Sequence, residues 1–163
     1  MTTPLIPKPI KFMKGQKFIF AAVLLILFVL SGFSQTKSQS NVSAVNSVKS
    51  SPAYAEILLR KTELTAELES LLVEYTEEYP KVSELRAELM FLQKDLDKIL
   101  AVSAADIPKL STALGKLIVR KAELETVLWK LQKDYKDDHP DVKTAKRKVQ
   151  IFESAIREIL PLK

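Results

Sequence analysis

The sequence of 163 residues contains no cysteine, only three glycines and a single histidine. The absence of cysteine excludes disulfide bonds, thiolate metal sites and lipid attachment through cysteine. Three glycines leave little material for phosphate-binding loops, which need several. One histidine gives almost no basis for histidine-dependent catalysis, and no paired carboxylates or nucleophile–base set stands out. We therefore expect no catalytic residues, no cofactor, no metal and no small-molecule substrate.

What the chain does contain is an internal repeat with a fixed interval of 60 residues. Residues 60–64 read Arg-Lys-Thr-Glu-Leu, and residues 120–124 read Arg-Lys-Ala-Glu-Leu. Residues 75–82 and 135–142 match at the same interval, with tyrosine first, proline sixth and valine eighth. No gap is needed between these matches, so we interpret the region as two copies of one helical unit.

An apolar segment precedes the repeats and covers residues 18–30. It is shorter than the ~20 residues of a spanning helix and has the length of a signal-peptide core. We expect residues 1–34 to be a signal peptide cleaved before Gln35, or an uncleaved membrane-anchor helix. Either form places the rest of the chain outside the cytoplasm, as a periplasmic, secreted or inner-membrane-anchored protein. Met13 is an alternative start. Four lysines precede the apolar segment: Lys8, Lys11, Lys14 and Lys17.

Local signals divide the remaining chain. Residues 35–51 are rich in serine, asparagine, valine and lysine without an apolar period, which predicts a flexible linker. Ser51-Pro52 is a strong helix start, because serine caps free amides and proline at the first helical position loses no hydrogen bond. The predicted parts are hairpin repeat 1 (52–100), a connector (101–110) with Ser103 and Asp106 available as caps, and hairpin repeat 2 (111–160).

Apolar residues at alternating spacings of three and four form a helix seam in each predicted helix. Such spacings place the side chains along one stripe of a helix, as in a coiled coil. Lys61 and Lys121 interrupt the stripe at matching positions, and we expect Lys61 to reach Asp95 or Asp97 or, alternatively, to extend its charged end into solvent. The main seam residues are Leu64, Leu68, Leu71, Leu85, Leu89, Leu92, Leu124, Leu128, Leu131, Val149, Phe152 and Ile156.

Two aromatic–proline pairs, Tyr79–Pro80 and His139–Pro140, mark the predicted hairpin turns. Each proline lacks an amide hydrogen and moves the residue before it out of helical geometry. If the chain reverses there, each seam residue faces an apolar partner. The alternative is one long helix kinked at each proline, because the heptad phase continues through it. That alternative would place Glu78 and Asp138 in the seam, which favours the hairpin.

Charge is divided between the two copies. Residues 51–100 hold six basic and eleven acidic side chains, whereas residues 109–163 hold thirteen basic and eight acidic ones. The two copies therefore carry net charges of −5 and +5. Opposite charge favours packing of one copy against the other, within a chain or between chains. The alternative interpretation is that these charges lie on solvated faces.

Two groups of polar residues were considered as sites. Asp137, Asp138, His139 and Asp141 resemble a metal cluster. The first copy keeps the proline of this turn but not the histidine, so we interpret the segment as a turn. Trp129 lies beside the seam, where it can fill a contact between hairpins or dock a partner. A basic patch offers contact with an anionic polymer or a partner, with a solvated face as the alternative; it comprises Lys143, Lys146, Arg147 and Lys148.

Residues 75–85 and 135–145 resemble a pattern, Tyr-x-x-x-His-Pro-x-Val followed by leucine, in periplasmic helices of the polysaccharide chain-length-determinant and exopolysaccharide-export family. The resemblance covers about twenty residues per copy. It implies a periplasmic helical domain in an oligomeric scaffold for polymer export. In this sequence no second spanning segment follows Leu160 and there is no kinase portion, so a full co-polymerase role is not implied. A looser likeness exists to small periplasmic holdase chaperones.

These observations predict an all-α protein in which an N-terminal signal or anchor helix precedes two tandem antiparallel helical hairpins. We expect a non-enzymatic envelope scaffold or interaction protein that works through helix–helix association, in connection with polysaccharide export. The alternatives are a periplasmic holdase-type chaperone and an anionic-polymer-binding protein. Expected partners are further copies of the chain or an envelope protein, together with the membrane through the N-terminal helix. No nucleic-acid partner is expected, because export separates the protein from it.

Overall fold

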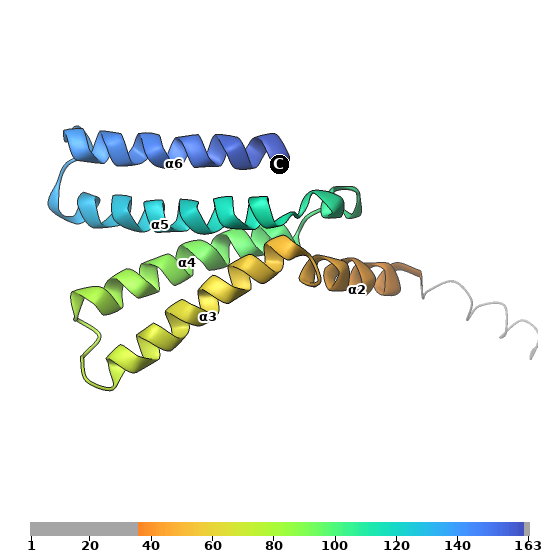
Figure 1. Ribbon diagram of the computed structural model, residues 1–163, viewed down its shortest axis with the longest axis horizontal. Helices are drawn as coiled ribbons and strands as arrows, with labels where there is room; N and C mark the ends of the chain where they lie inside the picture. Colours follow the sequence, from red (N-terminus) through yellow and green to blue (C-terminus); the bar gives the residue numbers. More distant parts are fainter. Residues whose placement is uncertain (1–35, 162–163) are drawn as a thin grey trace, which may run out of the picture. The chain divides into compact units, whose positions relative to one another are not determined.

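The computed structural model describes the backbone of residues 36–161 and the side chains of residues 43–161 (Figure 1). These residues form helices and no strand, so the predicted all-α class is confirmed for this part of the chain. None of the helices described is long and apolar enough to cross a membrane. The predicted signal or anchor segment, residues 1–34, lies outside the described residues. The helices are α2 (Thr36–Lys49), α3 (Pro52–Leu72), α4 (Pro80–Leu100), the 3₁₀ helix η1 (Ala104–Lys109), α5 (Thr112–Asp134) and α6 (Pro140–Ile159).

Helix α2 occupies the segment for which the sequence predicts a flexible linker. Its side chains from residue 43 onward are mostly exposed, in agreement with the missing apolar period. Val48 is the exception, because it is 1% exposed and belongs to the hydrophobic core. The amide of Ser51 donates to the carbonyl of Val48 at 3.0 Å, which joins the end of α2 to the start of α3. One apolar side chain without periodic neighbours gave no sequence signal for this helix.

Helices α3 and α5 begin in the same way, 60 residues apart. Ser51 caps α3 by accepting from the amide of Tyr54 at 3.3 Å, as predicted. Ser111 caps α5 by accepting from the amide of Leu114 at the same distance. Ser103 lies at the N-cap position of η1, but its hydroxyl donates to Asp106 Oδ2 at 2.7 Å and does not cap a backbone amide.

Helices α4 and α6 both begin at a proline, and the residue before each proline is extended as predicted. Tyr79 stacks on Tyr75 with ring centroids 4.2 Å apart. In the second copy His139 stacks on Tyr135 at the same separation. Figure 1 shows the chain turning back at both places, between α3 and α4 and between α5 and α6. An aromatic stack and a proline therefore build both turns.

The seam residues form much of the hydrophobic core. Leu64 is 1% exposed and Leu92 fully buried, and both belong to one continuous cluster with Ile57 and Ile99. The other buried seam residues are Leu68, Leu85, Leu124, Val149 and Ile156. Those that are half-buried are Leu71, Leu89, Leu128, Leu131 and Phe152.

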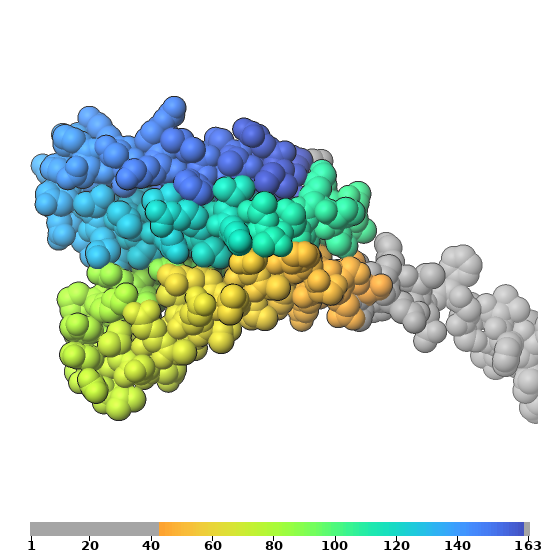
Figure 2. Space-filling view, in the orientation of Figure 1, coloured from red at the N-terminus to blue at the C-terminus, as the bar shows by residue number. Residues whose placement is uncertain are grey.

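Helix α5 is central to the packing. It packs against α3, α4 and α6, and α3 also packs against α4. Figure 2 shows the side chains of α5 filling the space between α6 and the α3–α4 pair. A pair of helices alone buries too little apolar surface to be stable. The contact of α5 with α3 and α4 therefore joins the two repeats into one core.

We predict that Leu92→Ala lowers the free energy of unfolding by about 2–5 kcal/mol, because it leaves a cavity in the joined core. Urea denaturation of the protein, followed by circular dichroism, measures the change. Met90→Ala is the matched control on the same helix, since Met90 is 57% exposed, and we expect a change of about 0.5 kcal/mol or less. Equal effects of the two substitutions would contradict the described core.

Candidate functional site

The contact between the two repeats is the most elaborate polar arrangement in the described residues. It brings acidic residues of α4 against basic residues of α5. Lys130 of α5 pairs with Glu84 of α4 at 2.6 Å, and Lys121 of α5 pairs with Asp95 of α4 at 2.7 Å. These pairs agree with the interpretation that opposite net charges favour packing of the copies, and they place that packing within a single chain.

Arg60 joins three helices. From α3 its Nε and Nη2 atoms donate to Glu88 Oε1 of α4 at 2.9 and 2.7 Å. Its Nη2 also lies 3.8 Å from Glu123 Oε1 of α5. Partial burial acts to lower the pKa of Arg60, but the hydrogen bond and charge of Glu88, followed by Glu123 and Glu63, outweigh it and raise the pKa. Glu88 is 8% exposed, and Arg60 compensates for the burial of its carboxylate.

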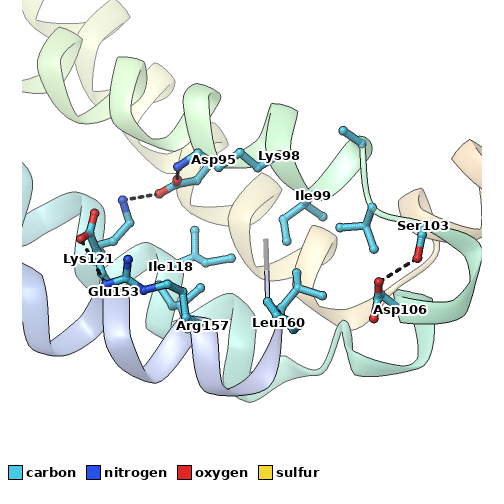
Figure 3. Close-up of a pocket in the computed structure, with 14 residues that line it drawn as sticks. Asp95, Lys98, Ile99, Ser103, Asp106, Ile118, Lys121, Glu153, Arg157 and Leu160 are labelled. Carbon is cyan, nitrogen blue, oxygen red and sulfur yellow. Dashed lines mark hydrogen bonds and ion pairs between the residues drawn. The ribbon is translucent and has the colours of Figure 1, made fainter. Parts of the chain in front are cut away.

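Lys121 forms the buried centre of the interface (Figure 3). Only 4% of the residue is exposed. Its Nζ lies 2.7 Å from Asp95 Oδ2 and 2.9 Å from Glu125 Oε2. The contact with Asp95 is an ion pair rather than a well-directed hydrogen bond. Burial acts to lower the pKa of Lys121, but the close contacts with the carboxylates of Asp95 and Glu125 outweigh it and raise the pKa.

The prediction that Lys61 pairs with Asp95 is wrong. Lys61 bonds to Gln93 instead, while Asp95 faces α5 and receives Lys121 and Lys98. The two lysines at equivalent repeat positions therefore differ in role. Lys61 lies at the edge of α3 and α4, whereas Lys121 is enclosed because α5 has a helix on both sides. Which lysine becomes buried depends on the stacking order, and the heptad pattern does not contain that information.

Gly115 allows α3 and α5 to approach closely. A Cβ atom at this position would lie 2.7 Å from the Cβ of Glu56 and 3.0 Å from the backbone of Ala53. The amide of Ala53 donates to the carbonyl of Leu110 at 3.1 Å, so the starts of both helices are also linked directly. Glycine inside a helix normally costs about 1 kcal/mol relative to alanine. Here it permits a contact that alanine would obstruct.

A pocket of about 620 Å³ opens beside Lys121, between the ends of α4 and α6, the start of α5 and η1. Figure 3 shows Ile99, Ile118 and Leu160 forming its apolar wall. The charged groups around it already have partners: Asp95 pairs with Lys98 and Lys121, Asp106 with Lys109, and Glu153 with Arg157. These internal pairs leave no charge set aside for a ligand. The pocket therefore indicates no particular chemistry.

The turn residues considered for metal binding have other contacts. Asp137 pairs with Lys146 at 2.9 Å, and its pKa is lowered chiefly by the bond to Lys146 and then by the bond to Gln132. His139 accepts from the amide of Asp141 at 3.3 Å through Nδ1, as a helix cap. Within the described residues, no three histidine, aspartate or glutamate side chains lie close enough together to hold a metal ion.

The predicted basic patch lies along α6. Lys146 is occupied by Asp137, whereas the other three side chains are exposed and have no acidic partner within 4.0 Å in the described part of the chain. Trp129 of α5 is half-buried, and the Nζ of Lys133 lies 3.5 Å from the centre of its ring. The three exposed members of the patch are Lys143, Arg147 and Lys148.

Comparison with known proteins adds no further assignment. The chain matches no protein-family model, no curated protein and no solved structure. The interface between the repeats is therefore interpreted from its own residues.

Lys121 and Asp95 should be strongly coupled, because removal of either partner leaves a buried charge. We predict that Lys121→Met and Asp95→Leu each lower the free energy of unfolding by about 3–5 kcal/mol. The double variant should lose less than the sum of the two losses, since apolar side chains then meet. Arg120→Ala, which removes an exposed pair with Glu123, serves as control with an expected loss of about 1 kcal/mol or less. Additive losses in the double variant would contradict the coupling.

The raised pKa of Lys121 determines how this contribution varies with pH. A group whose pKa is higher in the folded state stabilises the fold below its unfolded pKa, and the stabilisation is lost as pH rises through the folded value. We expect the stability difference between wild type and Lys121→Met to stay constant around neutral pH. It should decrease only above the ordinary lysine value of 10.5. Urea denaturation across alkaline pH measures it, and a decrease near neutrality would contradict the assignment.

Proposed function

We propose that this chain is a non-enzymatic scaffold or interaction protein of the bacterial envelope, built as two tandem antiparallel helical hairpins and acting through helix–helix association. The observation that carries the proposal is the use made of its buried polar side chains. Ser51 caps a helix, Glu88 receives Arg60, Asp95 and Lys121 join α4 to α5, and Thr126 bonds to the carbonyl of Ala122. Ser51 and Thr126 thus satisfy the backbone of their own helices, whereas Glu88, Asp95 and Lys121 join one helix to another.

Cross-helix contacts support the hairpin arrangement over one kinked helix in each repeat. Lys81 near the start of α4 lies 3.1 Å from Glu67 near the end of α3. Further from the turn, Arg60 contacts Glu88. Partners therefore move apart in sequence as their distance from the turn grows, as in an antiparallel pair. Glu78 and Asp138, which a kinked helix would place in its seam, are exposed.

The envelope location rests on the first part of the sequence. Lysines followed by the apolar segment 18–30 are typical of an export signal or an anchor. The resemblance of residues 75–85 and 135–145 to the chain-length-determinant family supports a role close to polysaccharide export. In this proposal the N-terminal segment delivers the chain, and the repeats contact an envelope protein or further copies.

Two linked measurements in a bacterial host test the proposal. Alkaline phosphatase, which is active only outside the cytoplasm, is fused to the C-terminus, and complexes are trapped in intact cells with an amine-reactive cross-linker. We expect active phosphatase and cross-linked species larger than one chain, because exposed lysines are present on both repeats. The connection with export is tested separately, by comparing the length of the exported polysaccharide in cells with and without the protein.

The control is a fusion without residues 18–30, which should be inactive and remain in the cytoplasm. Active phosphatase from this control, or full-length protein that is cross-linked to nothing, would refute an envelope scaffold. Unchanged polysaccharide length would remove only the connection with export.

A further inference from the structure

The face of α5 that packs against the first repeat consists mainly of small or apolar residues. Gly115 contacts α3 directly, and the next residues on the same side of the helix are equally enclosed. Ile118 is 2% exposed, Ala122 fully buried and Thr126 6% exposed. Spacings of three and four keep these four residues on one stripe. They form the surface through which the first helix of the second repeat docks.

The first helix of the first repeat carries the equivalent stripe 60 residues earlier, and no described helix covers its exposed residues. Leu58 is 45% and Leu59 58% exposed, and the small residues beside them are exposed as well. We call this set the α3 outer face. It consists of Ala55, Leu58, Leu59, Thr62 and Ala66.

The surface of the first repeat against which α5 packs also has an equivalent in the second repeat, and that equivalent is largely exposed. In the first repeat, α4 presents Phe91 and Asp95 at the interface, and Phe91 packs against the core. The residues 60 positions later on α6 are Ile151 and Ala155, and Ile151 is 55% exposed. Among the described helices, α5 is the one that packs extensively against α6. We call this surface the α6 outer face; it consists of Arg147, Lys148, Ile151 and Ala155.

Charges at these positions complement each other between chains. Within one chain, Arg60 contacts Glu123 across the repeat interface. The equivalent residues at the two open faces are Arg120 and Glu63. Each is exposed and pairs within its own helix, Arg120 with Glu123 and Glu63 with Arg60, so a contact between Arg120 and Glu63 of two chains would add to these pairs. Lys148 stands where the first repeat has Glu88, so the α6 outer face carries a positive charge where the first repeat carries a negative one. The acidic first repeat of another copy would bring negative charge to this basic face.

We propose that copies of this chain associate head to tail, with the α3 outer face of one copy docking on α5 and the α6 outer face of the next. This contact between two chains would have the same arrangement as the contact of α5 with α3 and α4 within one chain. The two faces are different surfaces, so the association is heterologous and each added copy presents a new free face. This inference rests on the proposed function and specifies its partner as a second copy.

The contact between copies is weaker than the contact within a chain. The buried pair of Lys121 and Asp95 has the equivalents Lys61 and Ala155, which form no ion pair. Gly115 has the equivalent Ala55, whose Cβ holds the helices slightly further apart. Assembly therefore depends on concentration and is reversible, while each chain keeps its own fold.

The absence of cysteine from the chain makes a cross-linking test direct. Lys130 contacts Glu84 within a chain, and the equivalent positions between copies are Ser70 and Thr144. Both are exposed, and α3 and α6 have no packed interface within one chain. Full-length protein carrying Ser70→Cys and Thr144→Cys is treated in envelope preparations with a short bis-maleimide and resolved on a denaturing gel.

We expect the double-cysteine protein to give a ladder of dimers, trimers and larger species. Each single-cysteine protein should give none, because its one thiol faces a position without a thiol. Co-expression of the two single variants should give dimers only. Adding Leu59→Asp or Ile151→Asp to the double-cysteine protein should reduce the ladder at least tenfold, whereas Met90→Asp, at an exposed position outside both faces, should leave it unchanged.

Several outcomes would overturn the inference. Dimers from one single-cysteine variant alone would indicate a symmetric contact, and a ladder insensitive to Leu59→Asp would indicate another surface. If the ladder is absent and the envelope protein instead binds an acidic polysaccharide resin, with Arg147→Glu and Lys148→Glu abolishing binding, the α6 outer face is a polymer site. In each case amine cross-linked envelope complexes would leave the scaffold proposal standing, so the two failures can be distinguished.

Discussion

The association of the two repeats depends on one buried cation. Lys121 lies among α4 and α5 side chains, where an ammonium group without a partner would be strongly unfavourable. Asp95 from the other repeat and Glu125 from its own helix compensate for that cost. A buried ion pair adds less stability than an apolar contact of equal volume, but it penalises any arrangement that separates the partners. The pair therefore specifies how α5 sits on α4, while the leucine seams supply most of the apolar burial.

Much of the helical organisation was readable from local signals. The Ser51 cap, the extended residues before both prolines and the buried leucines all follow from short-range chemistry. The cap at Ser111 could also have been predicted, because Ser111 lies 60 residues after Ser51 and the repeat interval therefore assigns it the same role. Helix α2 could not be predicted, because Val48 is its only buried side chain in the described residues and one apolar residue gives no periodic pattern.

The candidate site was less predictable than the fold. Opposite net charges indicated that the repeats pack together, and the pairs at Lys121 and Lys130 agree with this. The partner of Asp95 could not be derived, because sequence periodicity describes each helix pair but not the order in which pairs stack. Gly115 could not be interpreted either, since its value depends on a neighbouring backbone that is distant in sequence. Packing between repeats is thus the information that one-dimensional patterns omit.

The two turns reach their geometry with ordinary backbone conformations. No residue in the described part of the chain has a positive φ angle, and no peptide bond there is cis. A stacked ring pair and a proline do the work that glycine does in many tight connections. Glu77 and Asp137 between them pair with Arg86 and Lys146, whereas the neighbouring Glu78 and Asp138 are exposed and lie in no ion pair of the described residues. These tips should consequently accept foreign peptide insertions, which makes them suitable places for an epitope or a fluorescent label.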